Sequence, residues 1–171
     1  WAGEPFELSP FQAFVVSSIY GWQWSQTKMR RFRKAYVSMA RKGGKTAIGA
    51  GLGIKGMYFD EPIEPGAQVY CVATKEEQAK LLYTDATMLV EQCPWLLKKT
   101  KIRKAPHSIE YTSQASYFRL LGSDSTGSDG LNPHCVIMDE LHEWREHHRK
   151  LKEKLESAGI GCEGIVRVSS E

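Results

Sequence analysis

The fold of this chain is decided by one stretch, Tyr36-Val37-Ser38-Met39-Ala40-Arg41-Lys42-Gly43-Gly44-Lys45-Thr46. A short apolar run leads into a turn of small and basic residues, and an apolar helical pattern follows over residues 47–54. A strand, a glycine turn and a helix, with Gly-Lys-Thr at the junction, are the parts of a phosphate-binding loop. Glycines expose backbone N–H groups to phosphate oxygens, and the helix N-terminus adds positive charge. We therefore expect Lys45 to reach the β- and γ-phosphates of a nucleotide, and the Thr46 hydroxyl to bind Mg²⁺.

The match to the pattern G-x-x-x-x-G-K-[ST] is incomplete, because Met39 stands where the first glycine is expected. A basic strand-to-helix turn that binds nothing is the alternative interpretation of a short Gly-Lys-Thr sequence. A second, independent motif is needed to decide between the two.

That second motif is His134-Cys135-Val136-Ile137-Met138-Asp139-Glu140. Its apolar residues indicate a buried central strand, and the strand ends in two adjacent carboxylates. An unpaired buried charge is costly, so carboxylates at this tip indicate a cation in front of them. We expect Asp139 to hold Mg²⁺ through water, and Glu140 to polarise the attacking water as general base. A strand that simply ends in a polar turn is the alternative, and the phosphate loop upstream disfavours it.

The rest of the chain predicts alternating helices and strands. Helices are expected over residues 10–20, 46–58, 76–91 and 149–158, and strands over residues 36–40, 69–73, 135–138 and 165–168. A hairpin is expected from strands at 108–111 and 116–121, and a charged helix at 142–146. This order predicts an α/β fold with a mostly parallel central sheet flanked by helices, with the phosphate loop after one strand and Asp139-Glu140 after its neighbour.

Two further features have both a functional and a structural interpretation. Gln12, in a helix that Ser9 and Pro10 open, is either an exposed helical residue or an adenine reader, because its amide both donates and accepts hydrogen bonds. Two basic clusters either bind DNA phosphates or form a solvated surface. The clusters are Lys28, Arg30, Arg31, Arg33 and Lys34, and Lys98, Lys99, Lys101, Arg103 and Lys104.

Composition sets weaker limits. The 171 residues are 42% hydrophobic and 25% charged, which is ordinary for a globular protein, and the net charge of +3 is too small to indicate a nucleic-acid protein by itself. No apolar run approaches the ~20 residues of a membrane span. The cysteines form no C-x-x-C pair and are expected to be reduced. His142, His147 and His148 invite a metal hypothesis, but they lack the H-E-x-x-H spacing.

With these motifs established, the chain resembles the ATPase domain of the large terminase subunit, the DNA-packaging motor of tailed bacteriophages. Leu8-Ser9-Pro10-Phe11-Gln12 looks like the family's adenine-contacting motif, and residues 40–46 are similar to its phosphate loop, which tolerates loss of the first glycine. Residues 72–79 and 129–134 also resemble the corresponding segments of the family. The resemblance covers nearly the whole chain and implies a P-loop NTPase fold of the ASCE type.

The resemblance also implies roles for particular residues. Arg41 stands at the position of a family arginine that precedes the loop lysine, and would act as an arginine finger in cis. A ground-state phosphate contact or a salt bridge within the fold is the alternative. The implied ATP-binding residues are Gln12, Arg41, Lys42, Gly43, Gly44, Lys45 and Thr46. The implied catalytic residues are Glu140, Arg41 and Lys45, and the implied Mg²⁺ ligands are Thr46 and Asp139.

The function that the resemblance implies is ATP hydrolysis that drives double-stranded DNA into a procapsid, in the host cell cytoplasm. The implied partners are DNA, the portal protein, the small terminase subunit and further copies of the chain in a ring. Residues 1–171 would be a single N-terminal motor domain of a larger protein, without its nuclease domain. A helicase-like translocase is one alternative, although no second core domain is visible. A non-catalytic nucleotide- or DNA-binding module is another, which the adjacent Asp139 and Glu140 disfavour.

Overall fold

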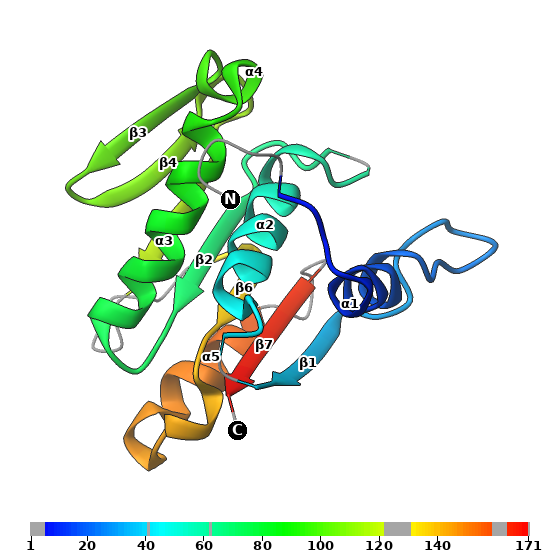
Figure 1. The fold of residues 1–171 in the computed structure, drawn as a ribbon, viewed down its shortest axis with the longest axis vertical. Coiled ribbons are helices and arrows are strands. Elements are labelled where there is room, and N and C mark those ends of the chain that lie inside the picture. The colour runs from blue at the N-terminus through cyan, green and yellow to red at the C-terminus, as the bar shows by residue number, and fades with distance from the viewer. Residues whose placement is uncertain (1–5, 41, 62, 122–130, 159–163, 171) are drawn as a thin grey trace.

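The computed structural model describes residues 6–40, 42–61, 63–121, 131–158 and 164–170. Its helices are α1 (Pro10–Tyr20), α2 (Lys45–Tyr58), α3 (Glu76–Glu91), α4 (Pro94–Leu97) and α5 (Arg149–Ala158). Its strands are β1 (Lys34–Met39), β2 (Gln68–Val72), β3 (Thr100–Lys104), β4 (His107–Tyr111), β5 (Ser116–Leu121), β6 (Pro133–Met138) and β7 (Gly164–Ser170). Short 3₁₀ turns lie at Thr112–Gln114 (η1), Leu141–Glu143 (η2) and Glu146–His148 (η3). Figure 1 shows these elements in chain order.

The strands form one seven-stranded sheet with the order β1-β7-β6-β2-β5-β4-β3. Strands β1, β7, β6, β2 and β5 run parallel, whereas β4 and β3 continue the sheet from β5 as antiparallel strands. Every residue of β6 is buried, as is nearly every residue of β2. Residues 69–72 and 135–138 are continuously apolar, as expected where helices cover both faces of a parallel sheet.

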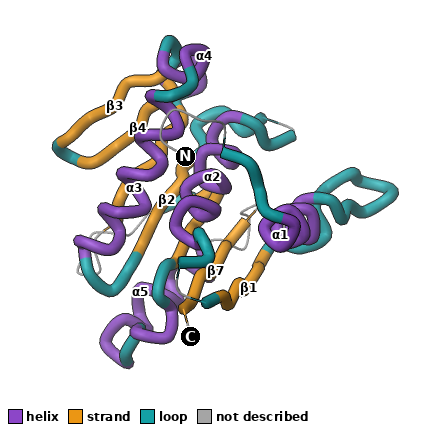
Figure 2. Tube along the Cα trace, viewed as in Figure 1, coloured by secondary structure: helices purple, strands orange, loops and turns teal. Residues whose placement is uncertain are grey.

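Helices cover the sheet on two sides. One core joins α2 and α3 to alternate residues of the central strands, such as Val69, Cys71 and Ile137. A second core joins α5 to the residues between them, such as Tyr70 and Val136, so α5 lies on the opposite face. A third, smaller core packs α1 and α2 against β1. Figure 2 shows α2 and α3 side by side across one face, with α1 beside β1 at the edge. Among the described residues, none of the helices is long and apolar enough to cross a membrane.

Helix α2 approaches the sheet very closely at Gly53. A Cβ atom there would lie 2.3 Å from Phe118 Cε2 and 2.8 Å from Ile137 Cδ1. Only a residue without a side chain fits this contact, because real Cβ atoms do not approach other atoms so closely. The glycine thus seats α2, and the phosphate loop that precedes it, directly against the strands that carry the site.

Most of the predicted elements are confirmed, including the α3 boundaries and the β4–β5 hairpin. Two expectations are wrong. The carboxylate strand β6 is not the neighbour of β1, because β7 lies between them and pairs with both. No strand was expected at 100–104, where the structure has the edge strand β3. The expected charged helix at 142–146 is replaced by the turns η2 and η3, since Trp144 between them takes an extended backbone.

Candidate active site

The glycine turn connects β1 to α2, as its sequence predicts. Lys42 and Gly44 take left-handed backbone angles, with φ of 65° and 79°, and the Gly43 N–H donates to the Ala40 carbonyl at 3.1 Å. Met39 is buried at the end of β1, and its Sδ lies 3.1 Å from where a Cβ of Gly43 would be. The methionine therefore fills the space beneath the loop. Arg41, the proposed arginine finger, lies outside the described residues.

Lys45 is the first residue of α2, and its Nζ forms an ion pair with Glu140 Oε1. Both side chains are mostly buried, with 13% and 16% of their surface exposed. A cation in the first turn of a helix is opposed by the helix dipole, whose positive end lies there. Lys45 therefore requires an anion, and Glu140 supplies it in this structure. A nucleotide phosphate would meet the same requirement.

The two carboxylates at the tip of β6 differ in setting. Asp139 is buried, its N–H donates to the Val72 carbonyl at 2.8 Å, and its Oδ1 accepts from the Glu140 N–H at 2.8 Å. Burial raises the pKa of Asp139 above its ordinary value, although the Glu140 N–H and the Lys45 charge act against it. Glu140 takes a left-handed backbone, with φ of 48°. This conformation is uncommon for a residue with a side chain, and here it ends the strand at the residue that pairs with Lys45.

Gln12 also lies at the glycine turn. Its Nε2 donates to the Gly43 carbonyl at 3.2 Å, and the same atom lies 2.7 Å from where a Cβ of Gly44 would be. Ser9 and Gln12 cap α1 reciprocally, which fixes the glutamine at the helix start. The amide predicted as an adenine reader is therefore held against the phosphate loop from a distant part of the sequence.

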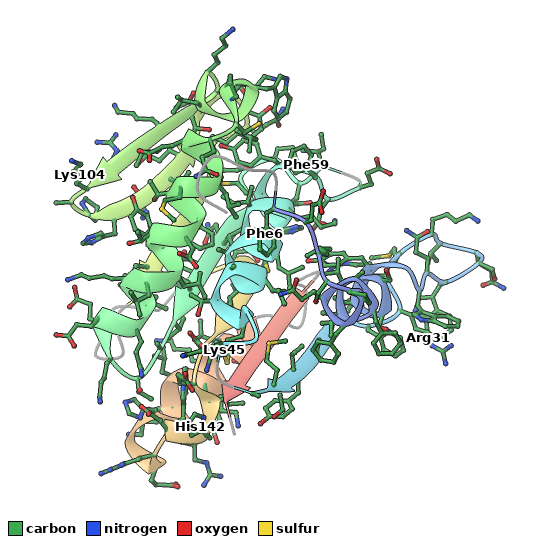
Figure 3. The ribbon with its side chains drawn as sticks, in the orientation of Figure 1. Phe6, Arg31, Lys45, Phe59, Lys104 and His142 are labelled. Atoms are coloured by element: carbon green, nitrogen blue, oxygen red, sulfur yellow. The ribbon has the colours of Figure 1, made fainter. Side chains whose placement is uncertain are left out.

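The turn after β6 supplies two groups that the sequence prediction missed. His142 Nδ1 lies 3.3 Å from Glu140 Oε2, so the histidine contacts the second oxygen of the same carboxylate. Trp144 Nε1–H donates to the Asp139 carbonyl at 3.1 Å. Figure 3 shows His142 and Lys45 in the same part of the molecule. The sequence signal was present, since both residues closely follow the carboxylates, but the expected helix would have directed them elsewhere.

The end of β2 also contacts this turn. The Thr74 hydroxyl lies 3.2 Å from Glu143 Oε2 and 3.2 Å from Gln78 Oε1. These contacts tie the start of α3 to η2, so the carboxylate turn is supported by the neighbouring strand.

This arrangement can be compared with known proteins. The family model of the terminase large subunit ATPase domain matches residues 10–158. The chain belongs to this family. The large terminase subunit of Enterobacteria phage HK97 is 27% identical over 143 residues, which are 84% of this chain and 27% of that protein.

Solved terminase structures share the fold. The crystal structure of the HK97 large terminase matches with a TM-score of 0.81 at 23% identity, covering 98% of this chain and 34% of that one. The large terminase of a thermophilic bacteriophage, crystallised with ADP, matches with a TM-score of 0.61 at 13% identity, covering 95% of this chain and 38% of that one. The chain thus spans roughly a third of the length of these terminases.

Membership in the terminase ATPase family implies that the chain binds a nucleotide. The predicted residues fit this well: Gln12, Gly43, Gly44 and Lys45 gather at one end of α2 with Glu140 opposite them. Lys42 is exposed on the same turn. Five segments far apart in the sequence therefore meet at one edge of the sheet, namely the start of α1, the glycine turn, the start of α2, the end of β2 and the tip of β6.

The residues present also fit the Mg²⁺ that the terminase family implies. Thr46 lies half-buried in the first turn of α2, and the buried Asp139 carboxylate has a raised pKa, which a nearby cation would relieve. Across the described residues, no group of three or more His, Cys, Asp or Glu side chains could hold a metal ion. Mg²⁺ needs no such group, because proteins usually bind it through one or two carboxylates together with water and substrate phosphates.

Proposed function

We propose that this chain hydrolyses ATP and that, within a larger terminase, the hydrolysis drives double-stranded DNA into a viral procapsid. The observation that carries the proposal is the Lys45–Glu140 ion pair. It joins the residue that would bind the γ-phosphate to the residue that would activate water. Gln12, hydrogen-bonded to the same loop, supplies the adenine contact.

The ion pair suggests how hydrolysis is held off until ATP binds. In the ion pair, the Lys45 ammonium occupies Glu140 Oε1, so that oxygen does not face an attacking water. The phosphates of ATP compete for Lys45 with more negative charge than one carboxylate. Glu140 is then released toward the γ-phosphate, where it accepts a proton from the attacking water. His142, on its other oxygen, keeps the carboxylate oriented during this exchange.

Bound Mg²⁺ would neutralise charge on the β- and γ-phosphates, with Thr46 and Asp139 as the residues that hold it. Arg41 would add positive charge to the transferring phosphoryl group from within the same chain. The partners that we propose are DNA, the portal protein, the small terminase subunit and further copies of the chain in a ring, all acting in the host cytoplasm. Residues 1–171 would serve as the motor domain of the larger protein.

The test is Mg²⁺-dependent ATP binding and turnover by the wild type, Lys45→Ala and Glu140→Gln. We expect Lys45→Ala to lose binding, and Glu140→Gln to bind ATP but to hydrolyse it roughly 10²–10⁴-fold more slowly. Glu146→Gln is the matched control, because its side chain is 85% exposed and pairs only with Arg149 among the described residues. A wild type without affinity at millimolar ATP would contradict the proposal. Normal turnover by Glu140→Gln would remove Glu140 as the base.

A further inference from the structure

Gln12 forms hydrogen bonds at both ends of its side-chain amide, and they join it to different parts of the molecule. Its Oε1 accepts from the Ser9 N–H at 2.9 Å, and its Nε2 donates to the Gly43 carbonyl at 3.2 Å. The first bond belongs to the cap of α1, whereas the second reaches the glycine turn, 31 residues away in the sequence. Each end of the amide can serve one further partner, such as a base. Reading a base does not require the bond to Gly43, so this bond indicates a second task.

The glycine turn needs a contact of this kind. Gly43 and Gly44 have no Cβ atoms, so the peptide between them can rotate at little cost. Gly44 has a φ of 79°, and a Cβ atom on it would lie 2.7 Å from Gln12 Nε2, so the glutamine lies directly against the turn. Met39 Sδ lies 3.1 Å from where a Cβ of Gly43 would be. Met39 therefore packs against Gly43, and Gln12 holds its carbonyl.

The Gly43 carbonyl and the Gly44 N–H belong to the same peptide unit. In a trans peptide the C=O and the N–H point in opposite directions. Because Gln12 holds the carbonyl, the Gly44 N–H is directed to the other side of the peptide, away from the Gln12 amide. Backbone N–H groups of such turns are the groups that bind phosphate oxygens. We infer that Gln12 is a positioning residue for the phosphate loop, which fixes the Gly43–Gly44 peptide and so prepares the turn for a triphosphate, whichever base the nucleotide carries.

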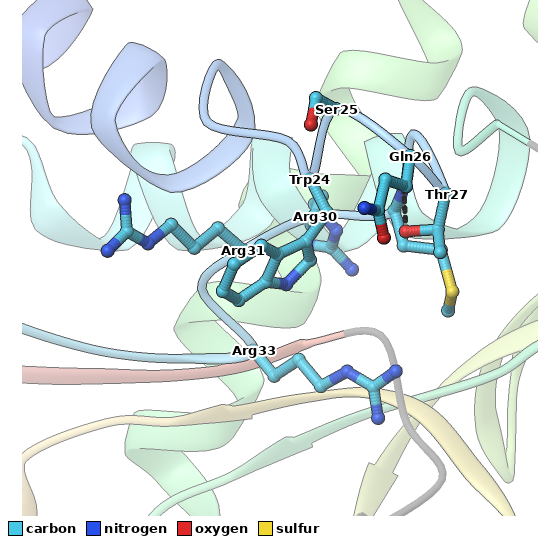
Figure 4. Close-up of a pocket in the computed structure, with 8 residues that line it drawn as sticks. Trp24, Ser25, Gln26, Thr27, Arg30, Arg31 and Arg33 are labelled. Atoms are coloured by element: carbon cyan, nitrogen blue, oxygen red, sulfur yellow. Dashed lines mark hydrogen bonds between the residues drawn. The ribbon is translucent and has the colours of Figure 1, made fainter.

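Helix α1 can hold Gln12 in place because the helix itself is anchored. A core of apolar residues joins it to β1 and α2, the two elements that flank the glycine turn. At its last residue, the Tyr20 ring lies 4.7 Å from the Arg30 guanidinium and 4.1 Å from Lys55 Nζ. Arg30 belongs to the segment between α1 and β1, where it lines a pocket (Figure 4), and it lies 3.7 Å from Asp60. Both ends of α1 are therefore fixed to the body of the protein.

The inference rests on the proposed function in one respect, namely that the glycine turn binds the phosphates of a nucleotide. It adds that Gln12 acts on binding through the loop as well as through the base. A residue that only reads adenine changes the affinity for adenine nucleotides and for no others. A positioning residue of the loop changes the affinity for every ligand that carries a triphosphate, including a ligand with no base.

The test compares Mg²⁺-dependent binding of ATP, UTP and inorganic tripolyphosphate by the wild type and Gln12→Met, measured by titration calorimetry. Methionine has a similar length but cannot donate, so the bond to Gly43 is lost. We expect the affinity for all three ligands to fall by roughly 2- to 10-fold, the usual net effect of one hydrogen bond, with any further loss confined to ATP. Gln26→Met is the matched control, because Gln26 is exposed and lies in the segment after α1, and its affinities should stay unchanged.

A second variant, Gln12→Glu, separates the bond to Gly43 from the cap of α1. A glutamate can accept from the Ser9 N–H as in a capping box, so the start of the helix is kept, but it cannot donate to the Gly43 carbonyl. We expect Gln12→Glu to lose at least as much affinity for tripolyphosphate as Gln12→Met, because its negative charge also opposes phosphate. Melting temperatures of the variants check that each of them folds.

Three results would overturn the inference. A loss in Gln12→Met that is confined to ATP would leave Gln12 as a reader of adenine alone. A wild type that binds ATP but neither UTP nor tripolyphosphate would show that the base supplies the affinity. Wild-type affinity for tripolyphosphate in Gln12→Glu would assign the effect to the cap of α1. If the wild type binds all three ligands and Gln12→Met weakens all three, but ATP is not hydrolysed, the inference stands and the proposed function fails. A wild type that binds none of the three contradicts both.

Discussion

Helix α2 carries a lysine–carboxylate cluster at each end, and the two clusters differ in kind. At its start, Lys45 pairs with Glu140 where the parallel strands end. At its last turn, Lys55 pairs with Asp60 at the opposite edge of the sheet. Lys45 and Lys55 are ten residues apart in α2, so their backbones lie about 15 Å apart along the helix.

The cluster around Asp60 is built for stability. Asp60 is 4% exposed and also receives His134 Nε2, at 2.9 Å, and the Arg30 guanidinium. Burial alone would raise the pKa of Asp60, but the hydrogen bonds from His134 and Lys55 and the charges of Lys55 and Arg30 lower it to about 2. Lys55 is also favoured by its place at the C-terminal end of the helix dipole. The fold itself thus supplies the three partners of the Asp60 carboxylate.

The cluster around Lys45, by contrast, combines several locally unfavourable features. Its lysine opposes the helix dipole, its glutamate has a left-handed backbone, and its aspartate is held with a raised pKa. Such local costs are typical of sites that a ligand completes. The comparison teaches that one ion pair joins groups whose partners the fold supplies, whereas the other joins groups that the proposed phosphate and Mg²⁺ would stabilise.

The largest effect on stability is expected from Asp60→Asn. The substitution leaves Lys55, Arg30 and His134 around a neutral side chain, and breaking a buried ion pair costs about 3–5 kcal/mol. For a domain of this size the melting temperature should fall by roughly 6–20 °C. Urea unfolding measures the change in free energy, and thermal unfolding measures the change in melting temperature.

Glu140→Gln serves as the comparison variant in the same experiment. Its unfolding free energy should fall by less than that of Asp60→Asn, because Glu140 is 16% exposed and loses its pair with Lys45, whereas Asp60 is 4% exposed and loses three charged or hydrogen-bonding partners. An equal loss of unfolding free energy in both variants would mean that the two clusters contribute equally to stability.

A smaller effect is expected from acid. Because the folded pKa of Asp60 lies below its ordinary value of 3.8, the carboxylate stabilises the fold above pH 3.8 and loses this contribution as the pH falls through about 2. The difference corresponds to about 2 kcal/mol. Unfolding free energies of the wild type and Asp60→Asn, measured from pH 5 downward, should converge by this amount. Parallel curves would show that the cluster does not hold Asp60 ionised.

An effect of similar size is expected within α2, between the two clusters. Gly53→Ala should destabilise the protein by about 1–3 kcal/mol, because its Cβ would overlap Phe118 and force the helix from the sheet. Gly51→Ala is the matched control: no atom lies within 4 Å of its Cβ, and alanine favours helix by about 1 kcal/mol. If Gly53→Ala raises the unfolding free energy as Gly51→Ala does, the close contact between α2 and the sheet is not required for stability.

The sequence predicted the parts of the site better than their arrangement. Local signals were enough for the glycine turn, the capped α1 and the buried β6, since capping residues and apolar runs act over a few residues. Strand order depends on which edges pair across more than a hundred residues, and no local pattern states it. The place of β7 was missed for this reason. His142 was missed because the turn after Glu140 follows from a left-handed residue that is not glycine.

The place of β7 has a consequence for how the chain folds. The described strand that pairs with β1 is β7, so the strand that leads into the glycine turn gains its sheet partner only when residues 164–170 have been made. During synthesis, β2, β5 and β6 can pair among themselves much earlier. Until β7 has been made, β1 is held only by its packing against α1 and α2. The edge of the sheet that carries the glycine turn therefore completes its strand pairing after the central strands can.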